Sequence, residues 1–324
     1  MKTKERVLSF LEEHKGNDIS GAQIAAALGV SRASVWKAVE ALRSEGYPID
    51  AASKKGYRLE NRSDILSKES IFPLLAPDSS VREIFVYKEV DSTNTAAKQL
   101  ANAGAQDGVL IAAEHQTAGR GRLGRQFFSP KGNGVYFSLM RRLPFPADVT
   151  TLVTSAAAVA VCRAIQSLYG IEAQIKWVND VYINGKKVCG ILTEASMNFE
   201  SQTLDYVVIG IGINVTAQEY PPELASIITS LDRYTDKTID RSRLIAAIVN
   251  VLDDFCEDLN ARTFLAEYRA RSFLMGQWIR VISPMQTYEA KVMEIDDNGH
   301  LVVQTSDGTM RVVSSGEVSV RPIE

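Results

Sequence analysis

The 324-residue sequence predicts a multidomain α+β protein made of three successive parts. Residues 1–62 hold three short amphipathic helices, separated by glycine- and serine-containing turns, and then two short strands. Residues 81–272 alternate apolar strands with helices, which indicates a mixed α/β domain. Residues 273–324 consist of strand-like runs separated by Asp-Asn-Gly and Asp-Gly turns, which predicts a small β-barrel. We expect residues 63–80, which contain two prolines, to be a linker.

Charge and cysteine usage narrow the class of protein. The whole chain has 36 Lys and Arg against 39 Asp and Glu, a net charge of −3, but residues 1–62 carry 11 basic against 8 acidic residues, a net charge of +3. A basic first domain on an acidic body favours a nucleic-acid partner. Cys162, Cys189 and Cys256 lie singly among apolar residues, so we expect them to be buried in a reducing cytoplasm. The apolar helix expected over residues 149–168 must lie in a core, and we identify no signal peptide or membrane span.

Capping signals divide the first domain into its helices. Ser20 is followed three residues later by Gln23, a capping box that opens a short helix from residue 21 to 28. Gly29 then permits a tight turn, and Ser31 caps a third helix. Two helices joined by a glycine-containing turn form a helix-turn-helix, in which the second helix enters the DNA major groove. The two strands that follow indicate a hairpin wing.

Five polar or basic residues of this domain are candidate DNA contacts. Arg32, Ser34 and Lys37 lie on the face of the third helix opposite its apolar side, and Lys54 and Lys55 lie in the turn of the wing. Small three-helix units also serve as protein-interaction modules, and exposed basic faces are commonly only solvated. The wing and the second cap favour DNA binding, without showing which residues contact bases and which contact phosphates.

A glycine- and arginine-rich loop is the strongest signal of a ligand site. Gly119, Gly121 and Gly124 fit the dinucleotide pattern G-x-G-x-x-G, but that motif requires a strand leading directly into it and a helix starting on it. Here the strand over residues 109–113 ends five residues earlier, and the strand over residues 135–139 follows. The loop therefore joins two strands. Its arginines match phosphate or carboxylate oxygens, which favours an anion-binding loop over a merely mobile surface loop.

A polar junction joins the strand over residues 84–87 to the helix that begins near Thr95. Ser92 or Thr93 can serve as the N-cap of that helix. Together with Asn94, the same hydroxyl groups can also hydrogen-bond a small polar ligand. The two interpretations are compatible, and both remain open from the sequence.

Two further strands carry residues that are unusual inside a sheet. Lys187 begins a strand that is otherwise apolar, so its ammonium group either extends to solvent from an edge or points into a site. Gly210 and Gly212 alternate within the strand over residues 207–215. Glycine weakens a strand, and its usual reason is the close approach of another backbone or of a ligand.

These motifs, taken in chain order, resemble those of biotin protein ligases. The resemblance rests on Gln116 with Gly-Arg-Gly-Arg-x-Gly-Arg, Lys-Trp-x-Asn-Asp ending at Asp180, Lys187-Val-Cys-Gly-Ile-Leu, and Gly-Ile-Gly-Ile-Asn ending at Asn214. With its helix-turn-helix and small β-domain, the chain is similar over essentially its whole length to the bifunctional class that also represses biotin-synthesis genes. Val178 stands where the family usually has proline, so we expect a looser turn with no functional group lost.

The resemblance implies a biotin/lipoate ligase-like catalytic domain, an SH3-like C-terminal barrel and a two-step reaction. Biotin and ATP would give biotinyl-5′-AMP and pyrophosphate, and a lysine of an acceptor such as biotin carboxyl carrier protein would then take the biotinyl group. No nucleophile of the enzyme is needed, which agrees with a sequence in which we find no cysteine or serine triad candidate. The resemblance also implies a homodimer, promoted by biotinyl-AMP, that represses transcription at an operator.

Matching positions assign roles to individual residues. The biotin and adenylate site would consist of Ser92, Thr93, Asn94, Gln116, Arg120, Gly121, Arg122, Lys187 and Asn214. Arg122 and Lys187 would be catalytic, with Lys187 contacting the biotin carboxylate and the α-phosphate, and Asn214 would contact adenine. Asp180 is the expected metal-linked carboxylate, with Mg²⁺ held mainly by the ATP phosphates.

Two other functions are compatible with parts of the sequence. Lipoate ligases resemble the central domain and run the same adenylation, but they lack this arginine-glycine loop and a DNA-binding domain. A biotin-responsive repressor without catalysis is disfavoured because Arg122 and Lys187 are both present. An assay with ATP, Mg²⁺ and either biotin or lipoate distinguishes all three.

Overall fold

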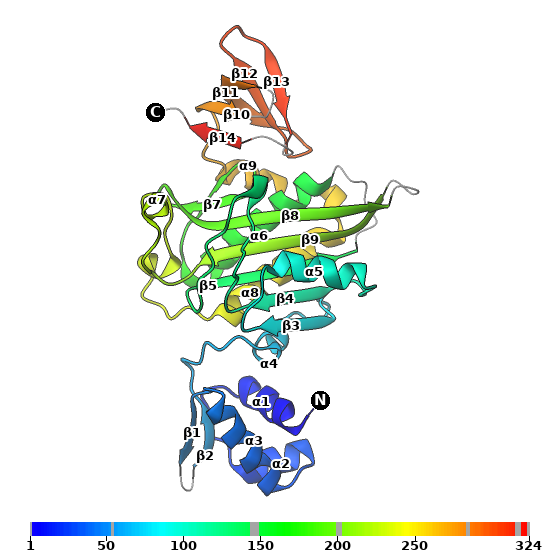
Figure 1. The fold of residues 1–324 in the computed structure, drawn as a ribbon, viewed down its shortest axis with the longest axis vertical. Helices are drawn as coiled ribbons and strands as arrows, with labels where there is room; N and C mark the ends of the chain where they lie inside the picture. The colour runs from blue at the N-terminus through cyan, green and yellow to red at the C-terminus, as the bar shows by residue number, and fades with distance from the viewer. Residues whose placement is uncertain are drawn as a thin grey trace. The chain divides into compact units, whose positions relative to one another are not determined.

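The computed structural model describes residues 2–52, 55–142, 149–198, 203–282, 286–314 and 319–322. The chain divides into two compact units (Figure 1). The first unit comprises residues 1–75 together with 240–246, and the second comprises residues 76–239 and 247–324. The first unit is therefore larger than the stretch of 62 residues in which the sequence predicts a DNA-binding domain.

The first unit contains the predicted winged helix-turn-helix (Figure 1). Its elements are α1 (Thr3–Glu13), α2 (Gly21–Leu28), α3 (Arg32–Ser44), β1 (Ile49–Ala52), β2 (Gly56–Leu59), α4 (Lys68–Ile71) and the 3₁₀ helix η1 (Phe72–Leu74). The predicted caps are present, because the Ser20 side chain accepts from the Gln23 amide and the Ser31 side chain accepts from the Ser34 amide. Gly29 adopts φ 63° at the turn, a left-handed conformation that glycine adopts readily. Strands β1 and β2 pair antiparallel as the wing.

Glu12 is a nearly buried carboxyl group in this unit. Its side chain is 5 % exposed, and the Lys15 ammonium group lies 3.7 Å away. Burial raises the pKa of Glu12 from 4.5 to about 7; Lys15 opposes this shift, and the negative charge of Asp240 adds to it. The folded protein therefore favours the protonated carboxyl group. The contribution of the Glu12 carboxyl group to the free energy of unfolding is fully present below pH 4.5, and it is lost as the pH rises through about 7.

Glu12→Gln should therefore stabilise the first unit at pH 8, by about 1–3 kcal/mol. The gain should shrink toward zero at pH 4, where the native glutamic acid is already neutral. Urea unfolding at both pH values, followed by the fluorescence of Trp36, measures the difference. Glu13→Gln removes an exposed carboxylate from the same helix and serves as the control. Equal gains from Glu12→Gln at pH 4 and pH 8 would contradict the assignment.

The second unit is built on a seven-stranded mixed sheet in the order β3-β4-β5-β9-β8-β7-β6. The strands are β3 (Glu83–Tyr87), β4 (Val109–Ala113), β5 (Gly134–Arg141), β6 (Gln174–Lys176), β7 (Asp180–Ile183), β8 (Lys186–Asn198) and β9 (Thr203–Asn214). Strands β3 and β4 pair in parallel, and the other neighbours pair antiparallel. The predicted hairpin turn between β7 and β8 is present, with φ 48° at Asn184 and φ 74° at Gly185.

Helices pack on both faces of this sheet (Figure 1). The helical elements of the second unit are α5 (Thr93–Asn102), η2 (Arg122–Gly124), α6 (Thr150–Tyr169), α7 (Pro222–Ala225), η4 (Leu231–Tyr234), most of α8 (Arg241–Glu257), η5 (Leu259–Ala261) and α9 (Leu265–Arg271). Thr193 of β8 accepts a hydrogen bond from Thr154 of α6, and its neighbour Glu194 pairs with Lys98 of α5. Because successive strand residues point to opposite faces, α5 and α6 lie on opposite faces of the sheet.

Helix α6 and the three cysteines form part of the core. Among the residues that the structure describes, α6 is the one helix long and apolar enough to cross a membrane, but 78 % of its apolar window is buried inside the protein. The predicted burial of Cys162, Cys189 and Cys256 is confirmed. Burial raises the pKa of the Cys162 and Cys256 thiols to about 12, which makes both poor nucleophiles.

The small β-domain predicted at the end of the chain is a five-stranded antiparallel sheet in the order β13-β12-β11-β10-β14. Its strands are β10 (Trp278–Ile282), β11 (Thr287–Ile295), β12 (Leu301–Thr305), β13 (Met310–Val313) and β14 (Ser319–Pro322). The buried Trp177 side chain donates a hydrogen bond of 2.9 Å to the Gly299 carbonyl oxygen, so the start of the Trp-x-Asn-Asp motif is held against this sheet. The next residue, Val178, is 2 % exposed, and its carbonyl oxygen accepts a hydrogen bond from Tyr268.

Candidate active site

The arginine-glycine loop joins two strands, as the sequence predicts. It lies between β4 and β5, which pair antiparallel, and no long helix begins on it. The Gly121 amide donates to the Arg125 carbonyl oxygen at 2.7 Å, and the Phe127 amide donates to the Gly119 carbonyl oxygen at 2.9 Å. The two sides of the loop are thus joined by the loop's own backbone hydrogen bonds.

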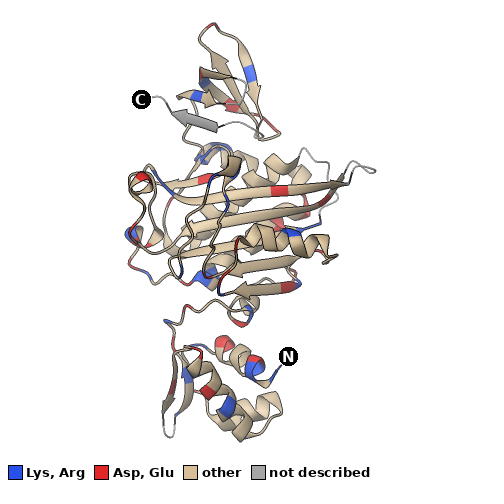
Figure 2. Ribbon diagram, in the orientation of Figure 1, with Lys and Arg blue, Asp and Glu red and all other residues tan. Residues whose placement is uncertain are grey.

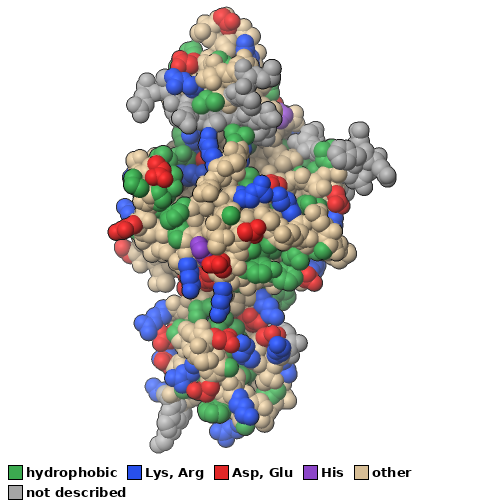
Figure 3. Space-filling model, viewed as in Figure 1, with side chains coloured by type: hydrophobic (Ala, Val, Ile, Leu, Met, Phe, Trp, Pro, Cys, Tyr) green, Lys and Arg blue, Asp and Glu red, His purple; other side chains and the backbone are tan. Residues whose placement is uncertain are grey.

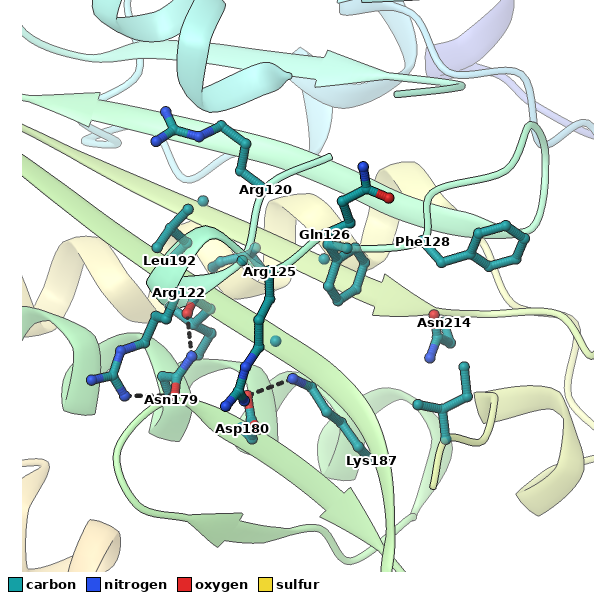
Figure 4. Close-up of a pocket in the computed structure, with 18 of the residues that line it drawn as sticks. Arg120, Arg122, Arg125, Gln126, Phe128, Asn179, Asp180, Lys187, Leu192 and Asn214 are labelled. Atoms are coloured by element: carbon teal, nitrogen blue, oxygen red, sulfur yellow. Dashed lines mark hydrogen bonds and ion pairs between the residues drawn. The ribbon is translucent and has the colours of Figure 1, made fainter. Parts of the chain in front are cut away.

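One pocket, with a volume of about 780 Å³, opens beside this loop (Figure 4). Its walls come from the N-terminal end of α5, the loop, strands β7 to β9 and the segment around α7. The structure brings together in it all the residues that the sequence places at the biotin, adenylate and metal site: Ser92, Thr93, Asn94, Gln116, Arg120, Gly121, Arg122, Asp180, Lys187 and Asn214.

The N-terminal end of α5 is capped by the residue that precedes the loop. Ser92 occupies the N-cap position, but its side chain makes no capping hydrogen bond. Instead the Gln116 side-chain oxygen accepts from the Thr93 amide at 2.9 Å, and the Gln116 side-chain amide donates to Ser129 at 2.8 Å. The expected N-cap position of Ser92 is therefore confirmed, but the acceptor for the helix amide comes from Gln116 and not from the Ser92 hydroxyl group. Ser92 also lines the pocket.

Two strand glycines make room for side chains of the pocket. A Cβ atom on Gly210 would lie 2.0 Å from the Asn94 side-chain oxygen, and one on Gly212 would lie 2.5 Å from the Phe127 ring. Asn94 is 3 % exposed, and its oxygen lies 2.6 Å from the hydroxyl group of the fully buried Ser138. The sequence indicated close approach of a backbone or a ligand at these glycines, and the structure shows close approach of side chains.

Charged groups gather at one side of the pocket (Figure 4). The Lys187 ammonium group lies 2.7 Å from an Asp180 carboxylate oxygen, so Lys187 points into the pocket and does not extend to solvent from an edge. Arg122 approaches the Asn179 side-chain oxygen at 3.4 Å. Burial lowers the pKa of the Arg122 guanidinium group, and the charge of Asp180 opposes this shift. Several cations around one carboxylate leave a net positive site that suits a phosphate chain.

Sequence reasoning missed several residues of this pocket. Arg125 lines it from the same loop as Arg120 and Arg122. Asn179 supports Arg122 and donates to the Ile191 carbonyl oxygen at 2.7 Å, and its place beside Asp180 in the motif could have drawn attention to it. Figure 4 places Asn214 apart from the Arg122 side, so the pocket has a charged end and a separate end that carries an amide.

The candidate DNA contacts lie in the first unit. Arg32 and Lys37 are exposed on α3, and Lys55 is exposed beside the wing turn. The Ser34 hydroxyl group lies 2.9 Å from that of Ser31, so it takes part in the helix cap. Lys54 lies outside the described residues. Figure 2 shows that lysines and arginines of this unit are interspersed with acidic residues.

The residues that the structure describes contain no group of three or more His, Cys, Asp or Glu side chains able to hold a metal ion together. Among the residues lining the pocket, Asp180 supplies the one carboxylate. The protein therefore offers at most a single carboxylate to a cation in this pocket, which fits a cation that arrives with most of its ligands already in place.

Three family models match successive parts of the chain. The HTH domain model matches residues 3–58, the Biotin/lipoate A/B protein ligase family model matches residues 86–214, and the Biotin protein ligase C terminal domain model matches residues 274–321. The three matches follow the order of elements in the structure: winged helix-turn-helix, mixed sheet and small antiparallel sheet.

Known proteins resemble the chain over most of its length. It is 38 % identical to the "Bifunctional ligase/repressor BirA" of Bacillus subtilis, an alignment that covers 97 % of this chain and 98 % of that protein. It is 26 % identical to the Escherichia coli protein of the same name, covering 94 % of each. Among solved structures, the biotin protein ligase from Aquifex aeolicus in complex with biotin and ATP matches with a TM-score of 0.64 at 28 % identity, covering 75 % of this chain and 100 % of that one.

Proposed function

This chain belongs to the family of bifunctional biotin ligase/repressor proteins, and from that membership we propose that it activates biotin with ATP, biotinylates an acceptor protein and represses transcription. The observation that carries the proposal is the single pocket in which Arg122, Lys187 and Asp180 lie with buried hydrogen-bonding groups such as Asn94. A ligand with a polar ring at one end and a phosphate at the other matches these two kinds of lining.

The first step joins biotin to AMP. A biotin carboxylate oxygen attacks the α-phosphorus of ATP, the bond from that phosphorus to the oxygen bridging to the β-phosphate breaks, and pyrophosphate leaves. Lys187 contacts the biotin carboxylate and the α-phosphate, and its positive charge stabilises the negative charge that develops in the transition state. Asn94, Thr93 and Gln116 line the pocket, and they would hold biotin so that its carboxylate faces the phosphorus.

The second step transfers the biotinyl group. The uncharged amine of an acceptor lysine attacks the acyl carbon of the mixed anhydride, an amide forms, AMP leaves, and the amine proton passes to solvent. Arg122 covers the anhydride and excludes water until the acceptor arrives, and Asn214 holds the adenine. No protein nucleophile is required. Burial raises the pKa of the Cys189 thiol, which lies on β8 beside the pocket, so that thiol is not a competing nucleophile.

Mg²⁺ would arrive with ATP. Bound to the phosphate oxygens, it would neutralise their charge, and Asp180 is the residue available to it. Because Asp180 already pairs with Lys187, one carboxylate would support both the lysine and the metal. The acceptor is a protein with an accessible lysine, such as biotin carboxyl carrier protein, and both proteins would be cytoplasmic.

A parallel assay with biotin and with lipoate tests the enzymatic proposal. The purified protein is incubated with ATP, Mg²⁺ and either acid, and the adenylate is detected by mass spectrometry. A carrier-protein domain serves as the acceptor, and its Lys→Arg variant serves as the control. We expect biotinyl-AMP and biotinylated acceptor. Lipoyl-AMP alone would indicate a lipoate ligase. If no adenylate forms with biotin or with lipoate, the protein is a repressor without catalysis.

The repressor function requires two copies of the chain, because a single winged helix-turn-helix covers only half of a symmetric operator. The outer edge of β3 is our candidate contact. The residues after β3 bond to those entering the loop: the Val90 amide donates to His115 at 3.2 Å, and the Thr117 amide donates to Val90 at 2.9 Å. Ordering of the loop on biotinyl-AMP would order this edge and lower the entropic cost of association.

Biotinyl-AMP should therefore shift the protein from monomer toward dimer, and biotin alone should do so less strongly. Sedimentation at micromolar protein measures the mass, and titration of a palindromic DNA duplex enriched from a random pool measures affinity. By linkage, DNA must tighten adenylate binding by the same factor by which the adenylate tightens DNA binding. Lys37→Ala should weaken DNA binding without changing the dimer. Identical mass and identical DNA affinity with and without biotinyl-AMP would refute the coupling.

A further inference from the structure

The side chain of Arg120 leaves the charged end of the pocket. Figure 4 shows its guanidinium group directed away from Asp180 and Lys187, although its backbone lies in the loop that lines the pocket. The guanidinium group lies 3.2 Å from a carboxylate oxygen of Glu194 on β8. Arg122, two residues further on, reaches Asn179. The two arginines therefore attach the loop to the sheet at two separate points.

Glu194 also holds a side chain in the floor of the pocket. The Asn94 side-chain amide donates to Glu194 at 2.9 Å and to the Leu192 carbonyl oxygen at 3.1 Å. Both amide hydrogens of Asn94 are thus occupied, which fixes which way its oxygen points. The oxygen lies 2.6 Å from the Ser138 hydroxyl group. Asn94 consequently has one orientation, and Glu194 is one of the groups that determines it.

A second cation keeps Glu194 ionised. The Lys98 ammonium group lies 2.8 Å from the carboxylate, on the face of the sheet that carries α5. Burial alone would raise the pKa of Glu194, but hydrogen bonds from Lys98 and Asn94 outweigh it and hold the pKa below its usual value. In Figure 3, lysine and arginine side chains gather over β8 near the N-terminal end of α5. The carboxylate is 20 % exposed, so its interactions are only partly screened.

We propose that Glu194 is a positioning residue. Its carboxylate holds the arginine-glycine loop through Arg120, and it fixes the orientation of Asn94 by accepting a hydrogen bond from the Asn94 side-chain amide. Both contacts converge on one carboxylate, so a single group couples the loop that covers the adenylate to the floor that receives biotin. The proposal rests on the proposed function in that the ligand is biotinyl-AMP. Glu194 does not touch the reacting atoms, so it acts on the binding of biotin and on retention of the adenylate more than on the chemical step.

Glu194→Gln keeps the shape of the side chain and removes its charge. The expected result is a rise of about tenfold in the KM for biotin and a similar rise in the dissociation rate of biotinyl-AMP, the scale of a charge-assisted hydrogen bond. kcat at saturating biotin should fall by a smaller factor. Dissociation is measured by chasing preformed labelled biotinyl-AMP complex with excess unlabelled adenylate. Unchanged dissociation in a folded Glu194→Gln protein would overturn the proposal.

A double-mutant cycle that combines Glu194→Gln with Arg120→Ala distinguishes the effect of the Arg120–Glu194 ion pair from a general effect on structure. Arg120 is on an exposed loop, so this variant should fold. If the Arg120–Glu194 pair holds the loop, the double variant should release the adenylate no faster than the faster of the two single variants. Strictly additive effects of the two substitutions on the dissociation rate would show that the Arg120–Glu194 pair does not hold the loop. The matched control is Glu267→Gln, which removes the same charge from a carboxylate that pairs with Arg163 and Arg271 and does not line the pocket.

The Glu267→Gln variant should release the adenylate within about twofold of the wild-type dissociation rate, because its ion pairs do not involve residues that line the pocket. Failure of the proposed function would look different from failure of this inference. A wild-type protein that makes no biotinyl-AMP would contradict the function, whereas normal synthesis combined with an unaltered Glu194→Gln variant would contradict only the positioning role.

Discussion

Replacing Lys187 by alanine should lower the rate of biotinyl-AMP formation by a factor of about 10² or more, the effect seen when one preorganised charge donor is removed from a site. The ammonium group points into the pocket and lies 2.7 Å from Asp180. Removing it takes away the charge that would stabilise the pentavalent phosphorus, and it also leaves Asp180 without its ion-pair partner beside the phosphate chain.

The adjacent residue provides the matched control for this prediction. Lys186→Ala changes the net charge of the protein by the same amount at an exposed position of the same strand, and it should leave adenylation near the wild-type rate. Single-turnover formation of biotinyl-AMP, measured at saturating biotin and ATP, separates the chemical step from binding. Near-normal single-turnover rates in a folded Lys187→Ala protein would rule out the assigned role.

The second large effect is expected at Arg122. Arg122→Gly should increase the rate at which biotinyl-AMP leaves the enzyme by about 10- to 100-fold, the scale of one or two lost hydrogen bonds to a charged group. ATP entry should change much less, because Lys187 and Arg125 remain in the pocket. The half-buried guanidinium group, supported by Asn179, covers the space between the loop and β7.

Glycine at this position also adds backbone freedom to the loop, and a neighbouring variant measures that contribution. Leu123 adopts φ 56°, a conformation that glycine adopts readily, and the residue is 52 % exposed. Leu123→Gly therefore introduces a glycine into the loop without removing a charged group from the pocket. If Leu123→Gly releases the adenylate as fast as Arg122→Gly, loop flexibility and not the guanidinium group is responsible. Release from Arg122→Gly at the wild-type rate would contradict the role altogether.

Local signals in the sequence were sufficient for the helix-turn-helix, the hairpins and the chemistry of the loop. Ser20 with Gln23 caps α2, and Ser31 caps α3, because each such interaction joins groups three residues apart along the chain. The Asn184-Gly185 turn adopts the two positive φ angles that its residues favour. The resemblance to biotin protein ligases likewise rested on short motifs, and it selected the residues that the structure brings into one pocket.

Only the tertiary structure decided how those motifs meet. Gln116 accepts from the first amide of a helix that begins 23 residues earlier, so Ser92 occupies its expected N-cap position without making the capping hydrogen bond. Lys187 could have faced solvent or the site, and the pairing of β7 with β8 turned it toward Asp180. Arg120 and Glu194 are 74 positions apart, so no spacing rule connects them. Capping and turn preferences act over a few residues of backbone, whereas these contacts depend on strand register and on which face of the sheet each side chain occupies.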